Sequence, residues 1–204
     1  MTAKKINPKQ KEFFNEKAEV WDEITIHDLG KVQYITDLLG IQGNDKILDV
    51  GTGTGIMIPF YEKHLTDGCI VAVDYSDKMI EVARSKYPAK EHPKVTFLVA
   101  DVYELKYDEE FDIVVCYSCF PHFVNQPLAI DLLSKALKRG GRLAVAHSNS
   151  ADKINGVHMN GGVEIKNDFL PSMQQLRQMM MANGLKVTFE RDDEEYFICI
   201  ATKR

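Results

Sequence analysis

The stretch Ile47–Gly55, ILDVGTGTG, constrains the fold of this chain more than any other. An apolar run containing one acid, Asp49, leads directly into three glycines at alternate positions. A short apolar run bounded by glycines is typical of a buried strand followed by a turn. Glycines allow positive φ and a close approach of the backbone to a ligand. The stretch therefore predicts a strand–turn–helix unit with a ligand site at the carboxyl edge of a parallel sheet.

The same alternation continues along the chain and predicts the fold class. The strands we expect are KILDV, CIVAVD, VTFLVA, FDIVVCY and RLAVAHS, and the helices between them are Ile56–Leu65, Asp77–Lys86 and Gln126–Lys138. Lys138–Gly141 is expected to end the last of these helices. A helix at Ser172–Asn183 then precedes LKVTFE and EYFICIAT, whose short link predicts antiparallel pairing. The expected fold is α/β, a Rossmann-like doubly wound seven-stranded sheet, mostly parallel with one antiparallel strand near the C-terminus, with two N-terminal helices at Pro8–Val20 and Asp28–Leu39.

Composition narrows the class of ligand and the location. The formal charge of -5 argues against the basic stripe of a nucleic-acid binder. No apolar run approaches the roughly 20 residues of a membrane span. The first residues carry lysines with no apolar block after them, so no signal peptide is expected and a cytoplasmic protein is predicted.

Cys116 and Cys119 form a Cys-x-x-Cys without a second pair, among four cysteines in all. We interpret them as buried or pocket-lining thiols. If the strand continues through both positions, alternation sends them to opposite faces, and only Cys119 approaches the pocket.

The acids around the glycine turn indicate the ligand. The spacing Gly-x-Gly-x-Gly differs from the dinucleotide fingerprint Gly-x-Gly-x-x-Gly, and an acid such as Asp49 is a poor neighbour for phosphates. Asp74 ends a predicted strand nineteen positions after Gly55, where an acid normally binds the two hydroxyls of a ribose. Together these features favour a nucleoside that carries positive charge.

The ordered motifs ILDVGTGTG, VDYSDKMIEVAR, VADVYEL, FDIVVCYSCFPHF and LKRGGRLAVAHS resemble the class I S-adenosylmethionine-dependent methyltransferases, and most nearly their small-molecule, methyltransferase-11-like branch. The resemblance covers about Lys46–Ser148. It implies S-adenosyl-L-methionine as cofactor, S-adenosyl-L-homocysteine as product and a small-molecule methyl acceptor. The cofactor-binding residues that it implies are Asp49, Gly51, Thr52, Gly53, Gly55, Asp74, Tyr75, Met79, Asp101, Val102, Tyr117 and Ser118.

The same resemblance sets the expected organisation. Residues 1–204 are expected to form one methyltransferase domain, a monomer or a homodimer, with no nucleic-acid or membrane partner. Its parts are lid or packing helices at 1–40, a cofactor-binding core at 46–148, an acceptor-side loop at 149–170, and a closing helix and strand pair at 171–204.

Three histidines are candidates for catalysis. His122, His147 and His158 follow the fourth and fifth strands, whose carboxyl ends open on the same edge. One of them could be a general base or bind the acceptor, and His122 is favoured. Two or three could instead hold a metal, although their spacing fits no metal motif, and no metal is predicted. They could also simply line the pocket.

Two other functions remain open from the sequence. The first is an NAD(P)-dependent oxidoreductase on a similar fold. The second is a non-catalytic protein that binds S-adenosylmethionine.

Overall fold

A seven-stranded sheet forms the centre of the computed structural model, which describes residues 7–204. The strands are β1 (Lys46–Val50), β2 (Cys69–Asp74), β3 (Val95–Val99), β4 (Phe111–Tyr117), β5 (Leu137–His147), β6 (Leu185–Asp192) and β7 (Phe197–Lys203). Their order across the sheet is β3-β2-β1-β4-β5-β7-β6. Strands β1 to β5 pair in parallel, whereas β7 pairs antiparallel with both β5 and β6. The predicted mostly parallel sheet with one antiparallel strand is confirmed.

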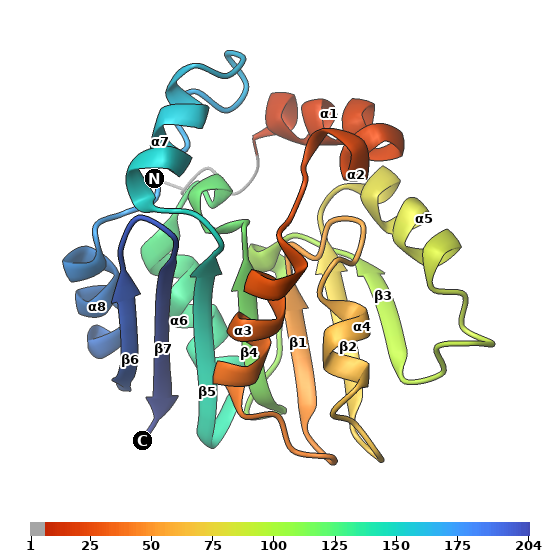
Figure 1. The fold of residues 1–204 in the computed structure, drawn as a ribbon. Helices are drawn as coiled ribbons and strands as arrows, with labels where there is room; N and C mark the ends of the chain where they lie inside the picture. Colours follow the sequence, from red (N-terminus) through yellow and green to blue (C-terminus); the bar gives the residue numbers. More distant parts are fainter. Residues whose placement is uncertain (1–6) are drawn as a thin grey trace.

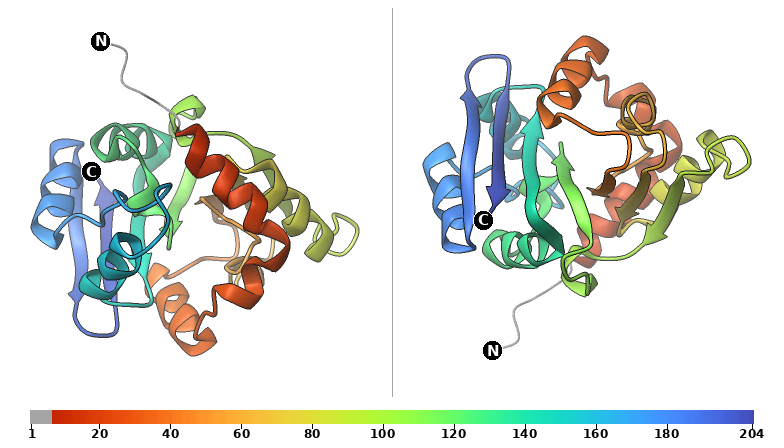
Figure 2. Two further views of the ribbon diagram at one scale, coloured as in Figure 1. Left: turned by 90° about the horizontal axis from the view of Figure 1, so that it is seen from above. Right: turned by 90° about the horizontal axis from the view of Figure 1, so that it is seen from below.

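Helices cover both faces of this sheet (Figures 1 and 2). The helices are α1 (Pro8–Lys17), α2 (Trp21–Ile24), α3 (Leu29–Leu39), α4 (Ile58–Glu62), α5 (Asp77–Lys86), α6 (Gln126–Ala136), α7 (Ala151–Met159) and α8 (Met173–Ala182), with short 3-10 turns η1 (Ala18–Val20), η2 (Val102–Glu104) and η3 (Phe120–His122). Apolar side chains of α3, α4 and α5 form one core with the sheet, and those of α6 and α8 form a second core on the opposite face. The central strands β1, β4 and β7 are buried on both faces over most of their length, which explains their near-continuous apolar sequences.

The strand order reverses between β1 and β4. From β1 the chain moves outward through β2 to β3, and it then crosses back to place β4 on the other side of β1. The connections leaving β1 and β4 therefore diverge, and a crevice opens at the carboxyl ends of these strands.

The N-terminal helices and α7 lie across that carboxyl edge. In Figure 1, α1, α2 and α7 sit above the ends of the strands, and Figure 2 shows α1 crossing the edge when it is seen from above. Helix α1 packs against α5, where Asn15 receives a hydrogen bond from the Ser76 hydroxyl at 2.5 Å. Residues 7–27 therefore cover the edge where the crevice opens.

The predicted helix boundaries hold where a capping residue marks them. Ser76 caps α5 by accepting a hydrogen bond from the Met79 amide, as expected. Ser172 caps α8 in a capping box with Gln175. Gly40 ends α3 with a φ of 60°.

Three local predictions are wrong. The segment Lys138–Gly141 does not end a helix, because α6 stops at Ala136 and β5 begins at once at Leu137. The helix expected at Ile56–Leu65 is shorter, since the glycine turn extends to Met57. The acceptor-side loop contains helix α7, whose N-terminus is capped by the Ser150 hydroxyl.

The two cysteines do not face opposite sides of the sheet. The chain leaves the β conformation at Ser118, which has a φ of 53°. Cys119 is thereby turned back toward the same core as Cys116. All four cysteines are free thiols, and Cys119 alone of them lines the cavity described below.

No helix within residues 7–204 is both long and apolar enough to cross a membrane. Residues 1–6 lie outside the described part of the chain, and with them lies the start of the segment in which no signal peptide is expected.

Candidate functional site

A deep cavity opens at the carboxyl edge between β1 and β4. Its walls come from the glycine turn, the ends of β2, β3, β4 and β5, and the N-terminal segment that covers the edge. Eleven of the twelve predicted cofactor residues line it: Asp49, Gly51, Thr52, Gly53, Asp74, Tyr75, Met79, Asp101, Val102, Tyr117 and Ser118. The twelfth, Gly55, faces Tyr87 instead, and a Cβ there would lie 2.8 Å from the tyrosine ring.

The glycine turn brings the backbone close to the cavity but offers few free amides. Gly51 and Gly53 have φ values of 69° and 56°, in the left-handed region that favours glycine. The amides of Gly51 and Thr52 donate to the Val73 carbonyl, and the Gly53 amide donates to Asp74. The Gly55 amide donates to the carbonyl of Thr52. Because these amides are already used, the turn is poorly suited to cradle a diphosphate.

Asp49 is a buried carboxylate at the floor of the cavity, and its side chain is 1% exposed. It accepts hydrogen bonds from the Thr52 hydroxyl at 2.6 Å and from the Tyr61 hydroxyl at 3.2 Å. Burial raises the pKa of Asp49 to about 6, and the charge of Asp74 adds to the rise, although both hydrogen bonds oppose it. A cation beside Asp49 would relieve this cost.

Asp74, at the end of β2, is held rigidly by backbone amides. One carboxylate oxygen accepts from the Gly53 amide at 2.9 Å, and the other accepts from the Ser76 amide at 2.8 Å. Burial raises its pKa, and the two amides lower it in part. Each oxygen retains acceptor capacity for a ligand hydroxyl.

The neighbouring wall is suited to a flat, partly polar ring. Met79 lies in the first turn of α5 and Tyr75 just before this helix, and Asp101 and Val102 follow the end of β3. These residues combine apolar surface with a carboxylate at one end. Such a wall matches the faces and the amino edge of an adenine.

The covering segment is tied to the rest of the site through Gln10. Its amide nitrogen donates to Asp168 at 2.6 Å, and its amide oxygen accepts from the Tyr75 hydroxyl at 2.9 Å. Phe14 packs edge-on against Tyr75 and Trp21. Gln10, Phe14 and Trp21 all line the cavity, so α1 and α2 form part of its wall.

The structure brings the three candidate histidines together, but only His122 lines the cavity. The rings of His122 and His158 lie 4.9 Å apart. His122 Nδ1 is 2.7 Å from a carboxylate oxygen of Asp168, and His158 Nδ1 is 2.6 Å from the Asp168 carbonyl. Asp168 therefore anchors both rings.

His147 is buried behind this group and is 3% exposed. Its Nε2 has no hydrogen-bond partner among the described residues, and its ring lies beside Phe197. Burial lowers the pKa of His147 to about 3, and the neighbouring His122 and His158 contribute to the fall. Neither His147 nor His158 is among the cavity-lining residues.

A fourth histidine, His27, lines the cavity and was missed by the sequence analysis. It lies between α2 and α3, where no periodic pattern indicates its direction. Its Nδ1 is 2.9 Å from the hydroxyl of Tyr117, which in turn is 2.9 Å from the hydroxyl of Ser148. Three elements distant in sequence thus form one hydrogen-bonded chain in the cavity wall.

Within residues 7–204, no group of three or more histidine, cysteine or acidic side chains is arranged to hold a metal ion. The acids of the cavity point instead to an organic cation. Asp49 and Asp74 are both buried, their pKa values are raised, and they lie at one wall. This donor set fits an adenosine that carries a positively charged group.

Comparison with known proteins agrees with this chemistry. A family model described as "Methyltransferase domain" matches residues 41–195. The ubiquinone/menaquinone biosynthesis C-methyltransferase UbiE of Teredinibacter turnerae is 30% identical over 123 residues, which cover 59% of this chain and 49% of that protein. The malonyl-[acyl-carrier protein] O-methyltransferase of Priestia megaterium is 32% identical over 97 residues, which cover 48% and 34%.

Among solved structures, magnesium protoporphyrin IX methyltransferase (ChlM) from Synechocystis PCC 6803, with S-adenosylhomocysteine bound, matches with a TM-score of 0.70. The match covers 96% of this chain and 100% of that one at 17% identity, so it shows the fold alone. The chain spans about half the length of the first curated relatives that it matches.

Proposed function

Since the chain belongs to the class I S-adenosylmethionine-dependent methyltransferases, we propose that it transfers a methyl group from S-adenosylmethionine to a small-molecule acceptor and releases S-adenosylhomocysteine. The observation that carries the proposal is the pair of buried acids, Asp49 and Asp74, beside a glycine turn in which four amides are already bonded. A diphosphate would add negative charge to this wall, whereas a sulfonium adds positive charge. The NAD(P)-dependent alternative therefore loses its support.

The residues present fit the cofactor. We assign Asp74 to the ribose hydroxyls, and we assign Tyr75, Met79, Asp101 and Val102 to the adenine. Asp49 and the turn Gly51–Gly53 are assigned to the methionine part, with Tyr117 and Ser118 beside the sulfur. When bound, S-adenosylmethionine supplies a methyl group that is already activated by its positively charged sulfur.

The chain's own contribution is to position the reactants and exclude water. The covering segment places Phe14 and Trp21 in the cavity wall, which removes that part of the site from solvent. Orientation and exclusion of water can lower the barrier of a displacement by several kcal/mol, roughly 7–11 in favourable cases.

We assign the acceptor side to the wall around His122. Its Nδ1 is held by Asp168, so the proton on this nitrogen is fixed when His122 is neutral, and Nε2 is left to accept a proton from an acceptor. His147 and His158, which lie behind the wall, are then supporting residues. Val124, Ser148 and Asn149 line the same cavity and offer a mixture of apolar and hydrogen-bonding surface. Such a wall suits a small organic molecule, and one relative is named for ubiquinone/menaquinone biosynthesis.

The direct test is a methyl-transfer assay with radiolabelled S-adenosylmethionine and a panel of phenols, amines, thiols and quinols. The proposal is supported if label is transferred to an acceptor and if this transfer is lost when Asp74 is replaced. Binding of S-adenosylhomocysteine with no transfer to any member of the panel would favour the non-catalytic alternative. Binding of NADH in preference to S-adenosylhomocysteine would refute the cofactor assignment.

A further inference from the structure

The carboxylate of the proposed cofactor has no lysine or arginine partner among the described residues that line the cavity. The amino-acid end of S-adenosylmethionine carries a carboxylate as well as an ammonium group. Four acids line the cavity, and no lysine or arginine is among the described residues that line it. Those acids are Asp22, Asp49, Asp74 and Asp101. A carboxylate entering this cavity therefore needs a donor that the acids do not provide.

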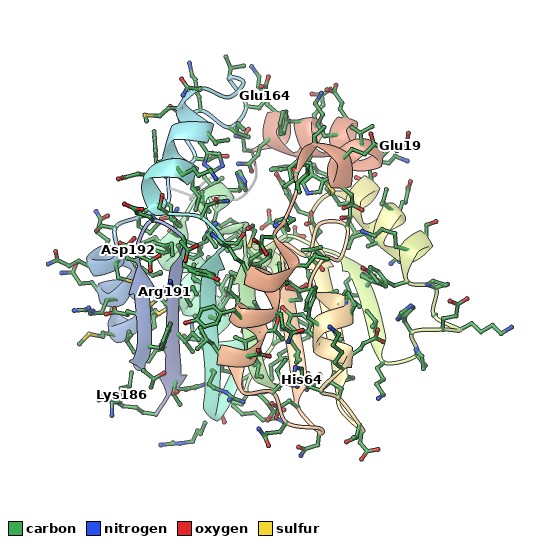
Figure 3. The ribbon with its side chains drawn as sticks, viewed as in Figure 1. Glu19, His64, Glu164, Lys186, Arg191 and Asp192 are labelled. Atoms are coloured by element: carbon green, nitrogen blue, oxygen red, sulfur yellow. The ribbon has the colours of Figure 1, made fainter. Side chains whose placement is uncertain are left out.

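Four backbone amides of the glycine turn are also engaged. In the glycine turn, the amides of Gly51, Thr52, Gly53 and Gly55 donate within the protein. Cations of the neighbouring elements are paired with acids, as Lys11 is with Asp77. Lys86 is paired with Asp22 at 2.6 Å, and Arg191, labelled on β6 in Figure 3, stacks on Tyr196 and is paired with Asp193. Two histidines, His27 and His122, remain in the described wall.

The sheet places His27 and Asp49 on the same side. Asp49 bonds to Tyr61, and Tyr117 bonds to His27; Tyr61 and Tyr117 both belong to the core under α3 and α4. In addition, β1 and β4 are neighbours in the sheet, with Asp49 opposite Val115. His27 thus shares a face of the cavity with Asp49, the acid assigned to the methionine part of the cofactor.

His122 approaches from the opposite face. It belongs to η3, whose residue Phe120 packs in the core under α6 and α8. Its Nδ1 already has a carboxylate partner in Asp168, and that negative charge would repel a second carboxylate. Among the described residues no acid is bonded to the His27 ring, and the hydrogen bond of this ring with Tyr117 uses Nδ1.

We propose that His27 binds the carboxylate of the cofactor's amino-acid end through Nε2 and takes up one proton from solvent as the cofactor binds. This inference rests on the proposed function, because it assumes that S-adenosylmethionine occupies the cavity. The imidazolium then donates from both nitrogens, one to the cofactor and one to the Tyr117 oxygen. The Tyr117 hydroxyl in turn donates to Ser148.

The surroundings of His27 allow this change of charge. Burial lowers the pKa of His27, and the nearby Asp22 opposes the fall, so the ring is neutral at pH 7.5 in the free protein. The charged and ionisable groups on the neighbouring elements include Asp28 and Lys31 at the start of α3, Arg191 on β6, and the phenols of Tyr117 and Tyr196, and both phenols have raised pKa values. Lys31 and Arg191 both lie over the Tyr196 ring and are paired with Glu195 and Asp193, respectively. Among the described residues, neither of these cations bonds to the His27 ring. The negative charge of the cofactor's carboxylate would therefore favour protonation of His27 when the cofactor binds.

The test is calorimetric titration of S-adenosylhomocysteine at pH 7.5 in buffers with different heats of ionisation, which reports protons taken up on binding. At this pH Asp49 is already ionised, so it releases little. Wild-type protein should take up a substantial fraction of one proton, and His27→Gln should abolish that uptake and weaken binding about 10–100-fold. His122→Gln is the matched control and should retain the uptake.

A ligand without the carboxylate makes the assignment specific. Decarboxylated S-adenosylhomocysteine should bind wild type and His27→Gln with equal affinity and without proton uptake. Uptake that persists in His27→Gln, or equal weakening of both ligands, would overturn the inference. Failure of wild type to bind either ligand would refute the proposed function itself, and melting curves of each variant verify folding.

Discussion

Replacing Asp49 with asparagine should make the free protein more stable and a poorer binder of its cofactor. The pKa of Asp49 is raised from 3.8 to about 6. Each unit corresponds to about 1.4 kcal/mol, so ionised Asp49 costs the fold about 3 kcal/mol at neutral pH. Asparagine removes the charge, and its amide can still bond to the hydroxyls of Thr52 and Tyr61.

The sign of the pH dependence follows from linkage. The folded protein retains the Asp49 proton to higher pH than the unfolded chain, so stability is lost as the pH rises from about 4 through about 6. The advantage of Asp49→Asn should be about 3 kcal/mol above pH 7 and about half of that at pH 5. For a chain of this length, 3 kcal/mol corresponds to a rise in Tm of about 6–12 °C.

Thermal and urea unfolding at pH 5 and pH 8 measure this difference, and calorimetry with S-adenosylhomocysteine measures the accompanying loss of affinity. Asp112→Asn is the contrasting control. Burial raises the pKa of Asp112, but hydrogen bonds from Lys138 and the Lys46 amide outweigh it and lower the pKa. That variant should lose stability at pH 8. If Asp49→Asn changed stability equally at both pH values, the reasoning from the buried charge would be wrong.

Three further predictions concern the walls of the cavity. Asp74→Ala should weaken S-adenosylhomocysteine binding by about 2–4 kcal/mol, and unchanged calorimetric affinity would remove Asp74 from the ribose site. Gly51→Ala should cost about 2–4 kcal/mol in urea unfolding, because φ is 69° and the new Cβ would lie 2.5 Å from the Cβ of Cys119; wild-type stability would contradict the close packing. His122→Gln should lower kcat at least tenfold with little change in cofactor affinity, since Asp168 fixes a ring that faces the acceptor; equal kcat would dismiss it as the base.

The regular part of the fold was predictable because several signals agreed. Apolar strands buried on both faces alternate with capped helices, and Asp74 stands at the strand end where the glycine turn leads one to expect it. The family resemblance implied residues at the ends of these strands, and eleven of those twelve line the cavity. Gly55 departs from it because its missing side chain makes room for Tyr87, which no local sequence signal indicates.

The acceptor side was harder to predict because tertiary contacts decide it. Helix α7 contains Asn155 and Gly156, which are weak helix formers. The Asn155 side chain holds the segment by bonding to both the amide and the carbonyl of Leu170. Strand alternation could have predicted the direction of His147. Its side chain lies on the side of Phe197, whereas the next residue, Ser148, faces Tyr117. His27 lies in a connection with no periodicity, so only the folded chain reveals its partners.

The double engagement of Gln10 has a kinetic consequence. A single amide links the covering helix to Tyr75 on one side and to Asp168 on the other. Escape of a nucleoside from beneath α1 then requires both links to break at once, so the residence time is governed by the opening of the helix. We expect Gln10→Ala to raise the association rate and the dissociation rate of the nucleoside by a similar factor. The equilibrium constant should then be almost unchanged.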